Sequence, residues 1–254
     1  MKVLGATSLA GLVLAVPMLC SAAEDPADCR VAEPMLEVSF ALPKVTKAIA
    51  GKKLDVVVIG AGSSILPGAS GARDAYPARL EKALAEKLPD VKTKVATDVK
   101  LRRTAADMVA TMPAVLAANK PVLVVWQTGT VDAMLGIDPD NFSAAVLKGV
   151  NTAHAAGADI ILVNAQYSPR TESMIALNTY IDDMRWVALQ QEIPLFDRFG
   201  IMKLWAELGT FDFSSPTKAL DTAERVHDCI GRLLANLIIE ATKPVEPLPI
   251  SGGR

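Results

Sequence analysis

Two adjacent serines in a glycine-rich turn are the residues of this chain best placed to do chemistry. Ser63 and Ser64 follow Gly60 and Gly62, where an apolar run ends. A serine hydroxyl at the mouth of a sheet can act as a nucleophile when a base accepts its proton. The glycines do not complete a dinucleotide-binding Gly-x-Gly-x-x-Gly pattern, because Ile65 stands at the third place, and no Walker sequence is present. The turn therefore predicts a nucleophilic serine rather than a phosphate site.

The base that would activate a serine must come from the two histidines of the chain. Glu224 precedes His227 by three positions, a spacing that lets a carboxylate orient an imidazole. On a helix, His227 shares a side with Ile230 and Leu234, so a helix-edge histidine held by local bonds is the alternative. His154 precedes a predicted strand and lies at the other edge of the sheet, so we interpret it as structural.

The elements that position these residues follow from hydrophobic patterning. Apolar, strand-like runs occur at residues 54–59, 92–96, 121–126, 159–163 and 193–196. Helical spacing occurs at residues 77–88, 104–119, 141–156, 172–190, 201–208 and 217–241. Uniformly apolar strands are buried on both faces, which requires helices on both sides of a parallel sheet. The sequence predicts one three-layer α/β domain over residues 24–242, with an irregular lead-in to residue 53 and a flexible tail at 243–254.

Polar residues at the carboxyl ends of the predicted strands are candidates for a binding site, because open α/β sheets bind ligands there. Gly129 and Asp132 follow the third strand, and Asn164 and Gln166 follow the fourth. Asp132 can orient a substrate or cap the next helix, and capping is the commoner role. Asn164 and Gln166 can line the mouth or stabilise their loop, and loop stabilisation is the commoner role.

Three short blocks resemble the SGNH (GDSL) hydrolases. They are Gly62-Ser63-Ser64-Ile65 with Gly68, then Tyr76-Pro77-Ala78-Arg79-Leu80, and Gln127-Thr128-Gly129-Thr130-Val131-Asp132. The resemblance extends from about residue 54 to 238. It implies a flavodoxin-like sheet of about five strands, a serine mechanism and no metal or other cofactor. It places Ser63 where the family has aspartate and Ser64 where it has the nucleophile.

The remaining roles carry over with gaps. Arg102 stands at the place of an oxyanion-hole glycine, where its backbone N–H can still donate, and Gly129 lies in the third block. Val131 stands where the family has an asparagine donor, and removing such a donor typically lowers turnover by about 10²–10³. The resemblance implies Ser64, His227 and Glu224 as the catalytic set. Matching residues 229–234 to the last helix of the family instead places its histidine nearer Asp221.

The first 23 residues have the layout of a secretory signal peptide. Lys2 precedes an apolar stretch, and Pro17 precedes the small residues Ser21-Ala22-Ala23. The sequence therefore predicts export to the periplasm or the exterior, with no stable membrane insertion after cleavage. A lipid anchor at Cys20 is the lesser possibility, because Leu19 stands where a small residue is expected.

Signal cleavage leaves two cysteines, Cys29 and Cys229, in an oxidising compartment where a disulfide persists. We predict that they are bonded, with Cα atoms about 4.4–6.8 Å apart. The alternative is a buried Cys229 and a free Cys29. Neither cysteine has a His or Cys at ligand spacing, so no metal site is predicted.

Composition narrows the partners. A formal net charge of −2 offers no basic surface, which argues against a nucleic-acid partner. The prediction is an exported esterase acting on a small acyl ester or an acylated saccharide, with deacylation of an envelope or exported polysaccharide as the specific hypothesis. The alternative is a binding or accessory protein that keeps the fold and has lost turnover. The oligomeric state stays open.

Overall fold

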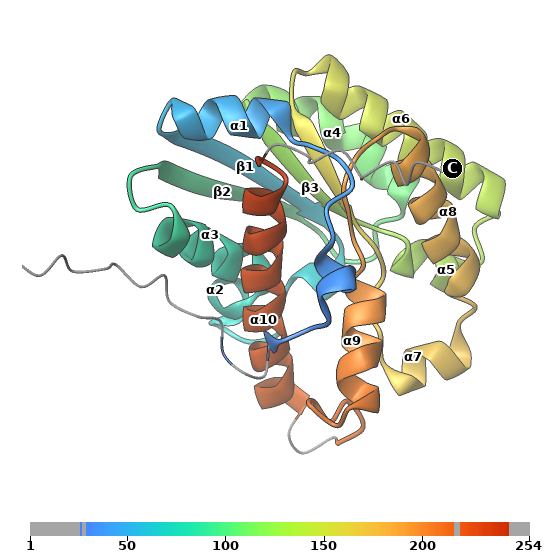
Figure 1. The fold of residues 1–254 in the computed structure, drawn as a ribbon. Coiled ribbons are helices and arrows are strands. Elements are labelled where there is room, and N and C mark those ends of the chain that lie inside the picture. Colours follow the sequence, from blue (N-terminus) through green and yellow to red (C-terminus); the bar gives the residue numbers. More distant parts are fainter. Residues whose placement is uncertain (1–25, 27–28, 216–218, 244–254) are drawn as a thin grey trace, which may run out of the picture.

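The chain forms a parallel five-stranded sheet between two layers of helices (Figure 1). The computed structural model describes residues 26, 29–215 and 219–243. The strand order is β2-β1-β3-β4-β5, with every neighbouring pair parallel. The strands are β1 Lys53–Gly60, β2 Lys92–Val99, β3 Leu123–Gln127, β4 Asp159–Val163 and β5 Leu195–Phe196. The predicted three-layer α/β fold is confirmed.

The central strands are apolar because both of their faces are covered. In β1, Val56 and Val58 pack into one core, while Val57 and Ile59 pack into the other. Helices α1 Pro43–Ala50, α3 Tyr76–Lys87, α9 Arg198–Glu207 and α10 Ala219–Glu240 contribute to the first core. Helices α4 Ala105–Asn119, α6 Pro139–Ala155 and α8 Asn178–Gln190 contribute to the second. Burial on both faces explains why these strands lack an alternating pattern.

The lead-in before β1 is more ordered than the sequence predicted. It contains a 3₁₀ turn at Glu33–Leu36 and helix α1, which begins with a proline at its first position. The first N–H groups of α1 receive no local cap. The distant Asp159 carboxylate accepts from the N–H groups of Lys44 at 2.8 Å and Val45 at 3.0 Å instead. A cap supplied from 114 or more residues away leaves no local signal, so this helix was missed.

The predicted helix at residues 172–190 is wrong as a single element. The structure has α7 Pro169–Met174 and then α8, separated by an extended Ile175. The break lets Leu177 enter the core, where its side chain is buried. Three more short helices connect the elements, at Gly62–Ser64, α2 Gly71–Asp74 and α5 Thr130–Leu135.

A disulfide fastens the lead-in to the last helix. Cys29 and Cys229 are bonded, with Cα atoms 4.9 Å apart, as predicted. Helix α10 lies directly against α3, and at Gly231 a Cβ atom would come within 2.6 Å of the Cβ of Arg79. The close approach therefore requires a glycine at this position.

None of the helices in the described part of the chain is long and apolar enough to cross a membrane. The predicted signal peptide at residues 1–23 lies outside the described residues. So does the predicted tail beyond residue 243.

The disulfide makes a measurable contribution to stability. It joins residues 200 positions apart, and closing so long a loop stabilises the folded state by about 5 kcal/mol in the chain-entropy model. We expect the double variant Cys29→Ser/Cys229→Ser to unfold at a lower urea concentration, and reduction of the wild type to give the same shift. Equal midpoints for the variant and the oxidised wild type would contradict this.

Candidate functional site

The serine loop begins at the end of β1 and turns through a short 3₁₀ helix, Gly62–Ser64. The N–H of Ser64 donates to the carbonyl of Ala61 at 2.9 Å, which closes the turn. A Cβ atom at Gly60 would lie 2.2 Å from the Ser64 Oγ. The glycine that ends β1 therefore lets Ser64 fold back against the strand.

Ser64 points into the protein rather than toward solvent. Its side chain is 1% exposed, and its Oγ lies 2.6 Å from the Gln127 Oε1 and 3.1 Å from the Tyr76 hydroxyl. Neither partner is a general base near neutral pH, because an amide oxygen binds a proton very weakly and burial raises the pKa of Tyr76. The residue predicted to be the nucleophile is thus held inside the loop.

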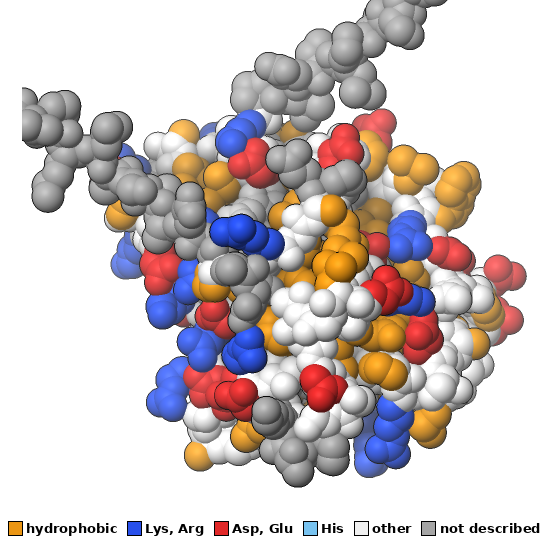
Figure 2. Space-filling model, turned by 60° about the horizontal axis from the view of Figure 1, so that its bottom comes forward, with side chains coloured by type: hydrophobic (Ala, Val, Ile, Leu, Met, Phe, Trp, Pro, Cys, Tyr) orange, Lys and Arg blue, Asp and Glu red, His pale blue; other side chains and the backbone are white. Residues whose placement is uncertain are grey.

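Ser63 is the serine that faces a cleft. Its half-buried side chain lines a pocket of about 580 Å³ between the serine loop, the loop after β2 and helix α5. Its Oγ donates to the same Gln127 Oε1, at 2.8 Å. The rim of the cleft includes three largely exposed apolar side chains, Leu101, Met134 and Leu135. Figure 2 shows that hydrophobic side chains are exposed on the face of the molecule at the bottom of Figure 1.

His227 is buried beside Arg198 rather than paired with a serine. Its Nδ1 accepts from the Tyr76 N–H at 3.0 Å, and its Nε2 lies 3.4 Å from the Arg198 Nη2. Burial and the neighbouring Arg198 charge lower the pKa of His227 to about 3. A histidine of such low basicity is a weak general base, and Ser64 is not among its hydrogen-bond partners.

Glu224 does not orient the imidazole as the sequence suggested. It lines a separate hollow with Arg79 and Asp228, while the Tyr76 N–H occupies the ring nitrogen that a carboxylate would need. The expected set of Ser64, His227 and Glu224 is therefore not assembled. Glu224 and His227 have the expected spacing in the sequence, but in the folded chain they contact different residues.

The three predicted oxyanion or binding residues divide into two roles. Arg102 adopts a left-handed φ of 58° and lines the Ser63 cleft, so it takes the backbone conformation that a glycine adopts readily. Gly129 has a φ of 95° and starts α5. Asp132 is buried, and its Oδ1 accepts from the Ala105 N–H at 2.9 Å, which ties the loop after β3 to α4. Burial raises the pKa of Asp132.

The remaining polar candidates are structural, with one exception. The Asn164 Nδ2 donates to Asp197 at 2.7 Å, and its Oδ1 accepts from the Phe199 N–H at 2.9 Å, so it stabilises its loop. Gln166 lines the Ser63 cleft. His154 lies in the last turn of α6 before β4, which places it at the opposite edge of the sheet.

Three residues that hold the serine loop were missed by the sequence analysis. They are Gln127 at the end of β3, Tyr76 at the start of α3 and the fully buried Arg198 after β5. The Arg198 Nη1 donates to the Ser63 carbonyl at 2.8 Å. Gln127 and Arg198 both lie at the carboxyl ends of strands, where open α/β sheets bind ligands, and the carboxyl end of β5 is the signal that could have identified Arg198.

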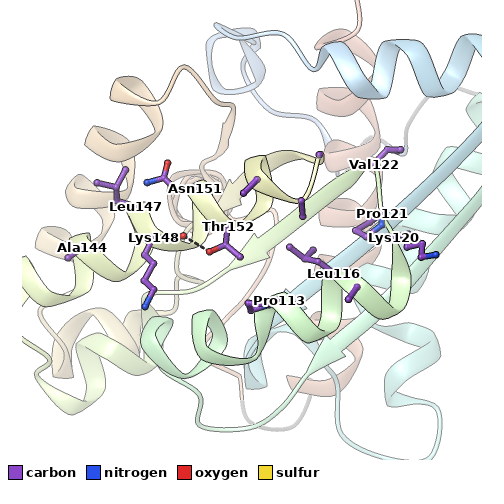
Figure 3. A pocket seen from close by; sticks show the side chains of 14 residues that line it. Pro113, Leu116, Lys120, Pro121, Val122, Ala144, Leu147, Lys148, Asn151 and Thr152 are labelled. Atoms are coloured by element: carbon purple, nitrogen blue, oxygen red, sulfur yellow. Dashed lines mark hydrogen bonds between the residues drawn. The ribbon is translucent and has the colours of Figure 1, made fainter.

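A larger hollow lies at the amino ends of β3 and β4, and its lining has no serine nucleophile or histidine base. It has a volume of about 1110 Å³ and is formed by α4, α6 and the segments before β3 and β4 (Figure 3). Its lining contains no serine, cysteine, histidine or carboxylate side chain. The Ser63 cleft is therefore the better candidate for a reaction.

Comparison with known proteins identifies the family. Residues 28–244 match the model of the non-GDSL lipase-like family. No curated protein matches the chain. Among solved structures, a lipase/acylhydrolase from Enterococcus faecalis is 15% identical with a TM-score of 0.61, and the match covers 76% of this chain and 100% of that one.

Two further structures share the fold. A putative lipolytic protein of the G-D-S-L family from Desulfitobacterium hafniense is 18% identical with a TM-score of 0.55, covering 73% of this chain and 99% of that one. A catalytic mutant of Axe2, an acetylxylan esterase from Geobacillus stearothermophilus, is 17% identical with a TM-score of 0.58, covering 74% and 94%. The chain belongs to the non-GDSL lipase-like family and has the fold of the SGNH ester hydrolases, which confirms the resemblance.

The buried state of His227 predicts a specific pH dependence. Its pKa falls from 6.5 in a free chain to about 3 in the folded protein, so the unfolded chain binds the extra proton between these values. Stability contributed by this residue is present above pH 6.5 and is lost as the pH falls. The linkage corresponds to about 2 kcal/mol between pH 7 and pH 5.

We expect His227→Gln, which can still accept from the Tyr76 N–H, to lose less stability than the wild type between pH 7 and pH 5. Urea unfolding at the two pH values measures the difference. Because other titrating groups are common to both proteins, identical losses would show that His227 is not held neutral.

Proposed function

We propose that this chain is an exported hydrolase of acyl esters in which Ser63, rather than Ser64, is the accessible hydroxyl. The observation that carries the proposal is the serine loop itself, which presents the Ser63 side chain to a cleft with an exposed apolar rim. Attack by the Ser63 Oγ on the ester carbonyl would form an acyl-serine and release the alcohol. Water would then cleave the acyl-serine and regenerate the hydroxyl.

The substrate class follows from the cleft. The exposed side chains of Leu101, Met134 and Leu135 suit an acyl chain, because removing their apolar surface from water would make the free energy of binding more favourable. The alcohol half of the ester is an acylated saccharide in this proposal. The similarity in fold to an acetylxylan esterase supports that choice.

Export is part of the proposal. The secretory layout of residues 1–23 and the bond between Cys29 and Cys229 both suit an oxidising compartment. An envelope or exported polysaccharide is then the acylated material that the enzyme meets.

Two features make slow turnover the expected behaviour. Gln127 is the hydrogen-bond partner of the Ser63 hydroxyl, and an amide cannot take its proton. Val131 lines the same cleft and has no donor for a developing oxyanion. Backbone N–H groups and substrate positioning remain, and such groups alone retain about 10³–10⁴-fold acceleration over water in a serine hydrolase without its triad.

A second candidate function is binding without turnover. It is favoured by the partners of the two serine hydroxyls, which among the described residues are Gln127 and Tyr76 and include no base. In that case the protein would hold an acylated ligand in the Ser63 cleft and release it unchanged.

Replacing each serine separately tests the proposal. We expect the wild type to hydrolyse short-chain aryl esters slowly, and Ser63→Ala to lower that rate at least 10-fold because the accessible hydroxyl is gone. Ser64→Ala is the matched control, since its hydroxyl is buried, and we expect it to keep most of the activity. A wild type no faster than Ser63→Ala would favour binding without turnover, and loss confined to Ser64→Ala would restore Ser64 as the nucleophile.

Adding an amide to the cleft should raise activity. Since one oxyanion donor is worth about 10²–10³ in turnover when it is well placed, we expect Val131→Asn to raise the rate by roughly 10-fold. The full effect is not expected, because the surrounding residues have not been shaped to hold the amide. Val131→Leu controls for side-chain size without adding a donor. Equal rates for the two variants would contradict the placement of the ester carbonyl near residue 131.

A further inference from the structure

Arg198 is a fully buried cation that has no carboxylate partner among the described residues. It begins α9, directly after the short strand β5. The preceding Asp197 does not neutralise it, because that carboxylate binds the Arg185 Nη2 at 2.7 Å, the Asn164 Nδ2 at 2.7 Å and the Gly200 N–H at 3.0 Å. Buried arginines in proteins are normally paired, since an uncompensated charge is costly away from water.

The contacts that Arg198 does make leave donors unused. Its Nη1 donates to the Ser63 carbonyl, and the guanidinium lies 5.4 Å from the centre of the Tyr76 ring. Its Nε is buried and has no hydrogen-bond partner in the described part of the chain. Burial lowers its pKa only to about 10, so the side chain stays charged at neutral pH.

His227 adds a second donor beside the guanidinium. Because its Nδ1 accepts from the Tyr76 N–H, the neutral ring carries its proton on Nε2. The Nε2 proton and the Arg198 Nη2 protons are then donors 3.4 Å apart with no acceptor between them. Two adjacent donors, one of them charged, match the two oxygens of an anionic group.

Both residues line a hollow that has room for a ligand. It has a volume of about 320 Å³ and lies beside the Ser63 cleft, since Gln166 lines both. Apolar walls come from Met202, Phe213 and Val226. The exposed Asp212 also lines the hollow, and its negative charge disfavours a ligand with more than one negative charge.

We propose that this hollow is a binding site for a carboxylate on a compact apolar or saccharide body, held by Arg198 and the Nε2–H of His227. One cationic side chain matches one negative charge, and the apolar walls match the rest of the ligand. The bound carboxylate would supply the counter-ion that Arg198 lacks. The site does not depend on ester turnover, so it can be tested whether or not the cleft is catalytic.

Calorimetric titration of the intact, disulfide-bonded protein tests the proposal with defined probes. We expect benzoate to bind with one-to-one stoichiometry and neutral benzamide, of the same shape, to bind at least 10-fold more weakly. Glucuronate distinguishes a saccharide acid from a simple aromatic acid, and tighter binding of either supports a carboxylate site. Equal affinity for benzamide, phosphate as tight as benzoate, or no binding of either acid would overturn it.

Variants identify the group that binds. Arg198→Gln should weaken benzoate binding at least 10-fold, because the charge-assisted hydrogen bond from the guanidinium and its attraction for the carboxylate are lost. Arg170→Gln is the matched control. Arg170 is an exposed arginine at the start of α7, and this substitution removes the same charge from the protein. An equal effect of both variants would show general electrostatic attraction and would overturn the site.

A measurement on the wild type covers the case in which Arg198→Gln does not fold. The titratable groups that face His227 are Arg198 and Tyr76, with Asp212 lining the same hollow. A carboxylate that accepts from the Nε2–H of His227 should shift the Nε2 and ring-proton resonances of this residue, measured by NMR at pH 7, where the ligand is ionised. His154, on the far side of the sheet, is the internal control. An unchanged His227 in saturating benzoate would overturn the proposal.

Discussion

The hydrogen bonds that Gln127 accepts from both serines determine how the loop can be used. One amide oxygen, fixed at the end of β3, receives the Ser63 hydroxyl at 2.8 Å and the Ser64 hydroxyl at 2.6 Å. The Tyr76 hydroxyl also hydrogen-bonds the Ser64 hydroxyl, and the Arg198 guanidinium donates to the Ser63 carbonyl. The loop is therefore fixed in a form that buries one serine and presents the other.

This arrangement links the two pockets of the carboxyl edge. Ser63 lines the cleft and donates its hydroxyl to Gln127, while its carbonyl accepts from Arg198, which lines the neighbouring hollow. A change in the charge of the Arg198 side chain would therefore affect the serine loop through its hydrogen bond to the Ser63 carbonyl. Burial, together with the same buried cation, keeps His227 neutral, which makes it a weak base for the loop.

The fold was readily predicted because its signal is carried by many residues at once. The uniformly apolar runs at residues 54–59, 121–126 and 159–163 indicated strands buried on both faces, and the helices between the runs followed from the spacing of apolar residues. The elements that were not predicted correctly depend on single contacts between residues far apart in the sequence. Helix α1 is capped by Asp159, which lies more than a hundred positions away, and the break before α8 serves the burial of Leu177.

The candidate site was predicted at the level of the loop but not of the side chains. The serine pair was identified because it directly follows β1. The disulfide was identified because Cys29 and Cys229 are the two cysteines that remain after the predicted signal cleavage. Sequence could not say which serine faces outward, because that depends on Gln127 and Tyr76 in other elements. The spacing of Glu224 and His227 suggested a contact between the carboxylate and the imidazole, whereas in the structure the His227 Nδ1 accepts from the Tyr76 N–H.

Mapping a covalent adduct shows directly which of the two serines is reactive. The intact protein would be treated with an alkyl fluorophosphonate, and the modified serine located by crystallography, which separates adjacent residues. We expect phosphorus bonded to the Ser63 Oγ, with the Ser64 Oγ still between Gln127 and Tyr76. Phosphorus on the Ser64 Oγ, with His227 turned toward it, would show that Ser64 is the reactive serine.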